Sequence, residues 1–341
     1  MARLVVVSFR LGANDGVSVE ARKWINALRK LGHDVTTLAG DGDADVLMPD
    51  LAIGATSSPS LDTLNQVIDN ADLVIVENLA SLPLNVPARD VLYQALDQRA
   101  AIFHHHDLPW QREQWRDEAT PRDQDLWLHV TINDLSRREL EERGVSAVTI
   151  YNSFDCDPPL GRRHLTRHAL GLENERLMLL PTRAIPRKNV AGALELATAL
   201  DAVLWLLGPA EDGYGPTLAN LLAESTVEVR RALPEGLTIH DAYAAADLVT
   251  LPSTWEGFGN PVLESVTHRR PLAVYPYPVL EEIRAFGFQF FDLDDVEGAL
   301  EFLDSPDDER LRHNAEIARR HFNLDALPQR LATLMAVVGL T

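Results

Sequence analysis

The chain has few of the features that mark secreted, membrane-spanning or metal-binding proteins. Cys156 is the only cysteine among 341 residues, which excludes an intrachain disulfide and argues against a cysteine-based metal site. No apolar run approaches the roughly 18 to 20 residues of a membrane-spanning helix. The apolar run at residues 4–7 lies between two arginines and is too short for the core of a signal peptide. A cytoplasmic protein without an integral membrane segment is therefore expected.

Positive charge is also scarce, and lysine most of all. The chain has 31 lysines and arginines against 51 aspartates and glutamates, a formal net charge of −20. Lysine occurs only at positions 23, 30 and 188. A chain this acidic has no electrostatic attraction for nucleic acid or for an anionic membrane surface. Solubility or adaptation to salt accounts for such a balance, but a local basic pocket remains compatible with it.

Short apolar segments alternate with amphipathic ones along the chain. Apolar residues make up 46% and charged residues 24%, as in globular proteins, and the length predicts two domains. Strands alternating with helices indicate parallel sheets built from β-α-β units. Strands are expected at 4–9, 33–39, 71–78, 100–107, 129–134 and 147–152, then at 177–182, 202–208, 227–232, 247–252 and 271–276, with helices at 17–31, 88–99 and 189–200.

The pattern restarts after residues 155–172, which we interpret as a linker because they contain two prolines and several cations. The predicted fold class is α/β, with two Rossmann-like, doubly wound domains at 1–155 and 170–320 that face each other across a cleft. A final helix is expected at about 308–338, and residues 321–341 are expected to pack back across the first domain. Such sheets bind ligands beyond the carboxyl ends of their strands, so reactive residues should follow strands.

The segment TWEGFGNPVLE, residues 254–264, follows one of these strands and holds two carboxylates around a turn. Gly257 and Gly259 permit close backbone approach. Asn260 is expected to cap a helix whose free amides form an anion site. Glu264, one turn into that helix, suits the diol of a ribose, and Glu256 suits the hydroxyls of a second sugar. The plain alternative is two solvated glutamates.

This segment resembles the EGFGxPxxE motif of the retaining, nucleotide-sugar-dependent glycosyltransferases of the GT-B type. The resemblance is to their large family of bacterial mannosyl- and glucosyltransferases and sucrose-phosphate synthases. It covers nearly the whole chain, and the first domain would then hold the acceptor and the second the donor. The other matching stretches are DGVSVEARKWINALRKLGHDV (15–35), IYNSFD (150–155), PTRAIPRKN (181–189) and AYAAADLVTLPS (242–253).

The resemblance assigns roles to residues of the second domain. Arg183 and Lys188 follow the strand at 177–182, and the matching pair in the family binds the diphosphate. Preorganised cations stabilise the charge that develops on a departing nucleoside diphosphate. Two solvated loop cations are the alternative. Catalytic roles are thus expected for Arg183, Lys188 and Glu256, and donor-binding roles for Arg183, Lys188, Gly257, Phe258, Gly259, Asn260 and Glu264.

In the first domain the resemblance points to Gly16 and His106. The family has two glycines after the first strand, and here Asp15 replaces one of them, which leaves Gly16 to approach the donor phosphate or acceptor. A plain turn is the alternative for Gly16. A family histidine at the position of His106 contacts the donor sugar or supports the reacting face, so His106 is expected to be catalytic. An ordinary strand-end histidine is the other interpretation.

Two further features of the first domain remain open. His104, His105 and His106 are consecutive, and adjacent strand residues point to opposite faces, so the three cannot chelate one metal and no metal site is expected. His104 shares the parity of His106. Trp110 and Trp115 offer ring faces to a sugar, with Arg112 or Arg116 for an anionic acceptor. A helix with its own apolar stripe explains residues 108–118 equally well.

The predicted function is transfer of a hexose from a UDP- or GDP-sugar to a hydroxyl acceptor, with retention and without a catalytic metal or cofactor. The acceptor is expected to be a soluble small molecule or glycan. Two alternatives stay open: a nucleotide-sugar 2-epimerase on the same fold, and a noncatalytic nucleotide-sugar-binding subunit. Incubation with UDP-N-acetylglucosamine alone would reveal an epimerase. A donor that binds but is never turned over would indicate the binding subunit.

Overall fold

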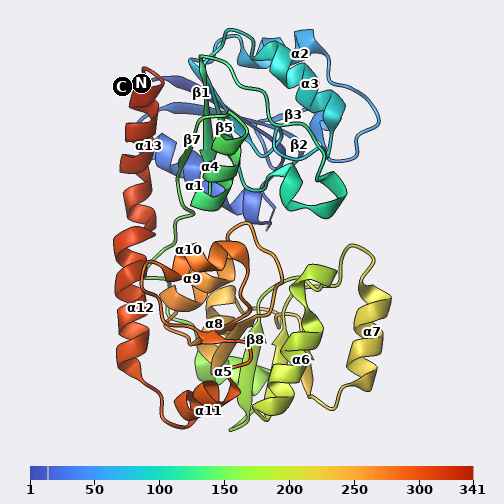
Figure 1. Cartoon of the computed structure of the whole chain (residues 1–341), viewed down its shortest axis with the longest axis vertical. Helices are drawn as coiled ribbons and strands as arrows, with labels where there is room; N and C mark the ends of the chain where they lie inside the picture. Colours follow the sequence, from blue (N-terminus) through green and yellow to red (C-terminus); the bar gives the residue numbers. More distant parts are fainter. Residues whose placement is uncertain (14, 341) are drawn as a thin grey trace. The chain divides into compact units, whose positions relative to one another are not determined.

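The computed structural model describes residues 1–13 and 15–340, which form two compact units. Unit 1 comprises Met1–Ser153 and Leu324–Thr341, and unit 2 comprises Phe154–Asn323. Each unit is an α/β domain with one parallel sheet between helices (Figure 1). No helix in the described part of the chain is long and apolar enough to cross a membrane.

Unit 1 contains a seven-stranded sheet in the order β3-β2-β1-β4-β5-β6-β7, with every neighbouring pair parallel. The order reverses between β1 and β4, which are adjacent strands. Its central strands are mainly apolar, as in a sheet covered on both faces, and buried polar residues such as Glu77 and His104 lie near their carboxyl ends. The strands are β1 (Arg3–Leu11), β2 (Asp34–Gly42), β3 (Val46–Leu47), β4 (Leu73–Glu77), β5 (Ala101–His105), β6 (Trp127–Thr131) and β7 (Ala147–Thr149).

The helices of unit 1 cover both faces of this sheet (Figure 1). One core packs around Trp24 and Leu28 of α1 and includes Leu331 and Met335 of α13. The other packs around Leu64 on the opposite face. The helices are α1 (Gly16–Lys30), α2 (Leu61–Ile68), α3 (Val86–Ala95), α4 (Asp134–Glu142) and α13 (Leu327–Val337), with 3₁₀ turns at Pro49–Leu51, Pro109–Gln111, Glu113–Trp115 and Leu324–Ala326.

Unit 2 contains a six-stranded sheet in the order β10-β9-β8-β11-β12-β13, again parallel throughout. The order reverses between β8 and β11. Its core is built largely on α6 and the central strands, with Leu180, Ala193 and Leu206 fully buried. The strands are β8 (Arg176–Leu180), β9 (Ala202–Leu206), β10 (Val229–Arg231), β11 (Leu248–Leu251), β12 (Leu272–Val274) and β13 (Phe291–Asp292).

Two expectations about helices are wrong. The helix expected at 308–338 is divided, because the buried Phe322 ends α12 and its carbonyl accepts the backbone N–H of Phe154 at 2.7 Å. The linker expected at 155–172 contains α5, which packs on α8. The helices of unit 2 are α5 (Arg163–Ala169), α6 (Val190–Ala199), α7 (Gly215–Glu224), α8 (Ile239–Ala245), α9 (Asn260–Thr267), α10 (Pro278–Arg284), α11 (Val296–Asp304) and α12 (Asp308–His321), with a 3₁₀ turn at Pro186–Lys188.

Candidate functional site

The candidate donor site of unit 2 lies where the strand order reverses. The loop after β8 carries residues 181–189, and the loop after β11 carries residues 252–259. Because β8 and β11 are neighbours and parallel, these two loops leave the same edge of the sheet side by side. A backbone hydrogen bond of 2.9 Å from the N–H of Thr254 to the carbonyl of Arg187 joins them. Ligands of doubly wound sheets bind at this kind of crevice.

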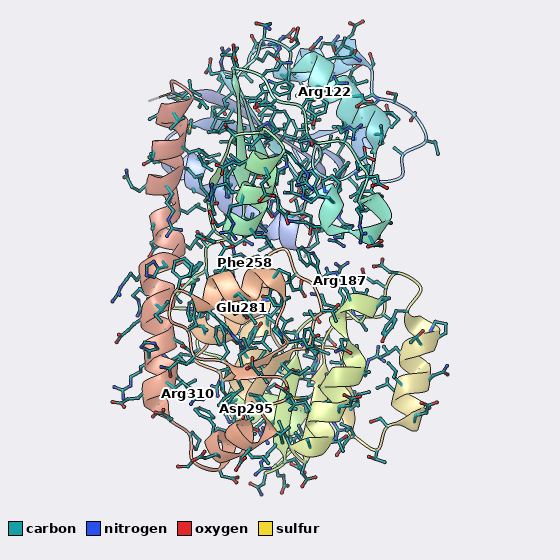
Figure 2. All side chains as sticks on the ribbon, in the orientation of Figure 1. Arg122, Arg187, Phe258, Glu281, Asp295 and Arg310 are labelled. Atoms are coloured by element: carbon teal, nitrogen blue, oxygen red, sulfur yellow. The ribbon has the colours of Figure 1, made fainter. Side chains whose placement is uncertain are left out.

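Three charged side chains from the two loops form one cluster. Glu256 accepts a hydrogen bond from the Lys188 ammonium through Oε1, and Arg187 Nη1 lies 2.9 Å from its Oε2. Arg187 Nη1 also donates to the Trp255 carbonyl at 2.8 Å. Lys188 and Glu256 are only 7% and 6% exposed, whereas Arg187 is half-buried. Figure 2 labels Arg187 on the loop that leads into α6.

The cluster brings two basic groups to one carboxylate, and burial lowers the pKa of Lys188 although the charge of Glu256 opposes that effect. Burial alone would raise the pKa of Glu256, but the charges of Lys188 and Arg187 outweigh burial and lower it. Two cations therefore face one carboxylate in a site where buried charges interact more strongly than in water. An anionic ligand would find a preformed positive centre here, with Glu256 holding both cations in place.

Arg183 and Glu264 belong to the same two segments but have other partners. Arg183 Nη1 pairs with Glu211 Oε2 at 2.6 Å, and both side chains are about 40% exposed. An exposed pair of this kind contributes little stability, so Arg183 can exchange its partner for a ligand at low cost. Glu264 Oε2 accepts a hydrogen bond of 2.7 Å from the Tyr243 hydroxyl, which fixes its carboxylate beside α8.

The start of α9 differs from the sequence expectation. Gly259 is the N-cap and Asn260 is the first helical residue, so the cap lies one residue earlier than predicted. Gly259 has φ = 85°, and a Cβ there would lie 2.2 Å from the Tyr277 hydroxyl. That hydroxyl donates to the Phe258 carbonyl at 2.9 Å. Gly259 is thus required by the packing of this chain itself. Phe258 is 3% exposed and stacks near Phe154, so its ring is a core element.

In unit 1 the chain order also reverses between β1 and β4, and the end of β4 holds a buried acid. Glu77, the last residue of β4, accepts hydrogen bonds from His104 Nδ1 and His106 Nε2 to its Oε2, each at 2.9 Å. Burial opposes ionisation of Glu77, but the two histidines overcome it and lower its pKa to about 2. The Asn78 side chain accepts the backbone N–H of His106 at 3.0 Å. His106 is therefore oriented by a carboxylate.

The side chains of the three consecutive histidines point to alternate faces of the sheet, as expected. His105 points to the other face, where its Nδ1 meets the Ser81 hydroxyl at 2.7 Å and its Nε2 meets His129 Nδ1 at 2.8 Å. On the first face His104 stacks on Trp24 of α1 with ring centroids 4.1 Å apart. The argument against a three-histidine metal site therefore holds, but it overlooked Glu77. Within the described residues, Glu77, His104 and His106 place three ligand atoms within 4.8 Å of one another.

After β1, Asp15 stands where the family has a glycine, and it caps the first helix. Asp15 is the N-cap of α1: its carboxylate accepts the backbone N–H of Ser18 at 3.1 Å and pairs with Arg10 at 3.1 Å. Burial would raise the pKa of Asp15, but the hydrogen bonds from Ser18 and the charge of Arg10 lower it. A Cβ added at Gly16 would meet no atom of the described residues within 4 Å, so these residues give no steric reason for glycine.

This contrast predicts opposite outcomes for two glycine substitutions. Gly259→Ala should lower the melting temperature by several degrees, because it forces an alanine into the left-handed region against Tyr277. Gly16→Ala should leave the melting temperature unchanged or raise it, since alanine favours the helix by about 0.5–1 kcal/mol. If Gly16 approaches a substrate, Gly16→Ala should still reduce turnover several-fold. Thermal unfolding and initial rates of both variants test this, and unchanged turnover in Gly16→Ala would remove Gly16 from the site.

The tryptophan segment offers less than expected to a sugar. Residues 109–115 form two 3₁₀ turns rather than one helix. Trp110 donates to Glu139 at 2.9 Å, and the Arg143 guanidinium covers its ring at 3.9 Å. Arg112 pairs with Asp107 at 2.9 Å. These contacts give Trp110 and Arg112 structural roles.

Comparisons with known proteins agree with this geometry. Residues 183–292, which include residues 183–189 of the first donor-site loop and all of the second, match the model of the family "Glycosyl transferases group 1". The chain is similar to GT-B glycosyltransferases in part of its sequence and in its fold. Two relatives named mannosylglucosylglycerate synthase resemble this chain over most of its length. The one from Thermotoga maritima is 24% identical over 95% of this chain and 97% of its own, and the one from Petrotoga mobilis is 25% identical over 84% and 86%.

Solved structures show the same fold. The chain superposes on Anabaena HepE in complex with UDP and glucose with a TM-score of 0.75 at 17% identity, covering 99% of this chain and 100% of HepE. Sucrose-phosphate synthase from Thermosynechococcus elongatus gives a TM-score of 0.74 at 16% identity, covering 99% of each chain. At these identities the likeness shows the architecture alone.

Three residues of the described site were absent from the sequence prediction. Arg187 is adjacent to Lys188 in the same PRKN loop, so the signal was the neighbouring cation. Glu77 ends an apolar strand beside the strand with the histidines, and its position at the end of β4 was the available clue. Tyr243 had no sequence signal beyond its place in the AYAAAD run, because its contact with Glu264 depends on the packing of α8 and α9.

Proposed function

We propose that this chain is a GT-B glycosyltransferase that moves a hexose from a nucleotide-diphosphate sugar to a hydroxyl acceptor, with retention of configuration and without a catalytic metal. The observation that carries the proposal is the buried Lys188–Glu256–Arg187 cluster at the carboxyl edge of β8 and β11. Unit 2 binds the donor, and unit 1 contributes His106 and binds the acceptor. The donor carries uridine or guanosine.

In this proposal the diphosphate is held by Lys188, Arg187 and Arg183. Arg183 leaves its exposed partner Glu211, and the buried Lys188 and the half-buried Arg187 interact with both Glu256 and the phosphates. As the glycosidic bond of the donor breaks, negative charge grows on the leaving phosphate, and fixed cations stabilise it without reorganising. Gly257, Phe258, Gly259 and Asn260 contribute backbone groups at the start of α9. A helix start is a favourable place for a phosphate.

The carboxylates bind the sugars at the two ends of the diphosphate. Glu264, held by the Tyr243 hydroxyl, accepts from the ribose diol, and Glu256 accepts from hydroxyls of the hexose. In unit 1, Glu77 accepts from the Nε2–H of His106, so His106 keeps one fixed orientation toward its substrate. Retention follows from departure and attack on the same face of the sugar, with the leaving phosphate accepting the proton of the acceptor hydroxyl.

The experiment is a donor and acceptor screen that measures release of nucleoside diphosphate. The relatives are named for making mannosylglucosylglycerate, so GDP-mannose and UDP-glucose with glucosylglycerate and glycerate are the first pairs to test. Product release that requires both substrates, with an α-linked product from an α-linked donor, is expected. Conversion of UDP-N-acetylglucosamine to an epimer without acceptor would support the epimerase instead. Donor binding without turnover by any acceptor would support the binding subunit.

Metal independence has its own test. Dialysis against EDTA should leave the turnover rate within about two-fold of the untreated enzyme, because the leaving phosphate is neutralised by arginine and lysine rather than by a divalent cation. The control is readdition of Mg²⁺, Mn²⁺ or Zn²⁺ one at a time. A loss of turnover on EDTA treatment that one of these ions restores would contradict the proposal, and Glu77, His104 and His106 would then be the first ligands to substitute.

A further inference from the structure

A second cavity of unit 2 lies at the opposite edge of its sheet from the donor loops. It has a volume of about 830 Å³. Arg176 is the first residue of β8, Asp247 directly precedes β11, and Arg270 and Pro271 precede β12, so these lining residues mark the amino ends of three strands. Helix α9 starts at the donor loop and ends just before Arg269. The cavity is therefore separate from the donor site.

The charge around this cavity departs from that of the whole chain. Six arginines line it against three acidic residues, in a protein whose formal net charge is −20. An excess of arginine in one place is unexpected for a surface whose composition favours acids. Arginine is the side chain best suited to bind phosphate, because its planar donors match the phosphate oxygens. The arginines are Arg163, Arg167, Arg176, Arg269, Arg270 and Arg312.

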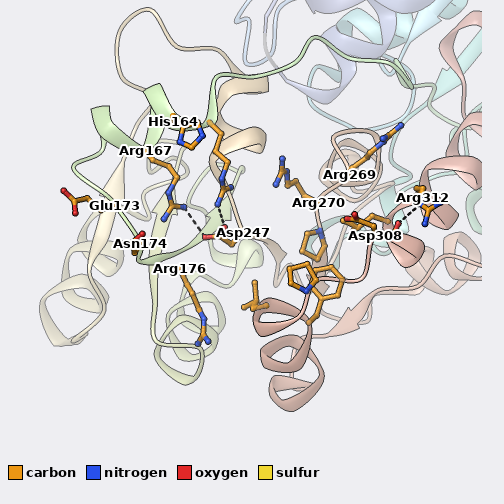
Figure 3. A pocket seen from close by; sticks show the side chains of 16 residues that line it. His164, Arg167, Glu173, Asn174, Arg176, Asp247, Arg269, Arg270, Asp308 and Arg312 are labelled. Atoms are coloured by element: carbon orange, nitrogen blue, oxygen red, sulfur yellow. Dashed lines mark hydrogen bonds and ion pairs between the residues drawn. The ribbon is translucent and has the colours of Figure 1, made fainter.

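Part of this charge is already used inside the protein. Arg163 pairs with Asp247 Oδ1 at 2.5 Å and donates to the carbonyls that end α8. Arg167 lies 3.1 Å from Asp247 Oδ2. Figure 3 shows Arg167 and Arg270 on either side of Asp247. The Asp247 carboxylate thus pairs with two guanidinium groups, and the charge of the residues that line the cavity remains positive.

The Arg270 guanidinium lacks a full set of hydrogen-bond partners. Its Nη1 makes one long hydrogen bond of 3.3 Å to the Ala246 carbonyl, and its buried Nε has no partner among the described residues. Burial and repulsion by Arg163 lower the pKa of Arg270, although Asp247 opposes them. A partly buried cation without a full set of partners is costly, and a bound anion would remove that cost.

The backbone conformation of Arg269 is a second, independent observation that points to a ligand at this cavity. It follows the C-cap of α9 with φ = 53°, in the left-handed region, where glycine is the usual residue after a helix. Holding arginine there costs stability that glycine would not cost. The side chain is exposed and lines the cavity, so the protein keeps a cation at a position where its backbone favours glycine.

We propose that this cavity binds a small phosphate monoester. Arg270, with Arg163 and Arg269, binds the phosphate group, and the apolar side of the cavity at Pro271, Phe302 and Leu311 accepts the organic part. The volume is within the range of sites for small molecules, roughly 300–1,000 Å³. This site does not depend on the proposed glycosyl transfer.

The test is calorimetric titration of glycerol 3-phosphate into the full chain, with inorganic phosphate and glycerol as comparisons. Wild type should bind glycerol 3-phosphate and phosphate but not glycerol. Arg270→Gln should weaken binding of glycerol 3-phosphate about ten-fold or more, the loss expected for one charge-assisted hydrogen bond. Arg269→Gly should weaken it as well, while its melting temperature stays equal to or above wild type because the backbone strain is relieved.

Two matched variants locate the site. Arg183→Gln removes a cation of the donor loop, and Arg319→Gln removes an exposed cation of unit 2 that pairs with Asp157. Both should bind glycerol 3-phosphate within about two-fold of wild type if the phosphate sits at Arg270. Loss of binding in Arg183→Gln with binding retained in Arg270→Gln would place the anion in the donor site and overturn the proposal. Absence of any binding to wild type at millimolar concentration would also overturn it.

Discussion

Replacing Lys188 with alanine is expected to reduce the rate of sugar transfer by about 10²- to 10³-fold, the usual cost of one preorganised charge-stabilising group. The Lys188 ammonium is buried against Glu256, so its charge is screened little by water and acts fully on a diphosphate beside it. The measurement is initial-rate kinetics with saturating donor. Lys30→Ala, which removes an exposed lysine, is the control and should keep the wild-type rate.

The same substitution should cost less stability than its counterpart at Glu256. When Lys188 is removed, Glu256 keeps Arg187 as a partner at 2.9 Å. When Glu256 is removed, Lys188 stays buried beside Arg187 and near Arg183, which repel it. Removing one partner of a buried pair costs about 3–5 kcal/mol, so Glu256→Ala should melt at a lower temperature than Lys188→Ala. Near-wild-type turnover in both variants would remove the cluster from the mechanism.

Acidification from pH 7 to pH 4 is expected to lower the free energy of unfolding by several kcal/mol. Burial is the main cause that lowers the pKa of His129 and of His268 to about 4, from an ordinary value of 6.5. A histidine with a lower pKa in the folded protein binds fewer protons there than in the unfolded chain, so stability is lost as the pH falls from about 6.5 to 4. The lowered pKa of each histidine corresponds to a loss of at most about 3 kcal/mol in the free energy of unfolding.

Protonation of Glu77 lowers the free energy of unfolding further at still lower pH. Its pKa is depressed from 4.5 to about 2 by His104 and His106, against the effect of burial, so its contribution is present above pH 4.5 and declines below it. The measurement is urea unfolding at steps between pH 7 and pH 4. His129→Gln should flatten the dependence between pH 6.5 and 4, whereas His168→Gln, at an exposed histidine, should not. A wild-type stability that stays constant over this range would contradict the account of the buried histidines.

The sequence predicted the elements of this fold better than their ends and their contacts. Apolar strands such as residues 177–182 were visible because a parallel sheet buries both faces and leaves continuous apolar runs. The two-residue strands β3 and β13 were missed, because a segment of two residues is too short to show an alternation of apolar and polar side chains. The helix α5 was missed because two prolines precede it and its arginines are typical of a solvated linker. In the structure Arg163 and Arg167 pair with Asp247 and donate hydrogen bonds to carbonyls at the end of α8.

The site could be predicted as a set of residues but not as a set of pairs. The motif at 254–264 and the loop at 181–189 identified Glu256 and Lys188 separately, because each follows a strand. Their direct contact depends on β8 and β11 being neighbours, which the chain order alone does not fix. His106 was identified but its partner Glu77 was not, because the two lie 29 positions apart and meet only where β4 pairs with β5.

The account is tested most directly by calorimetric titration of UDP, GDP and ADP into wild type and Lys188→Ala. Specific recognition of a nucleoside diphosphate at the Lys188–Glu256–Arg187 cluster predicts that UDP or GDP binds wild type with a dissociation constant in the micromolar range and that Lys188→Ala weakens that binding about 100-fold, or by about 2.7 kcal/mol. Failure of all three nucleotides to bind wild type, or equal binding to both proteins, would contradict it.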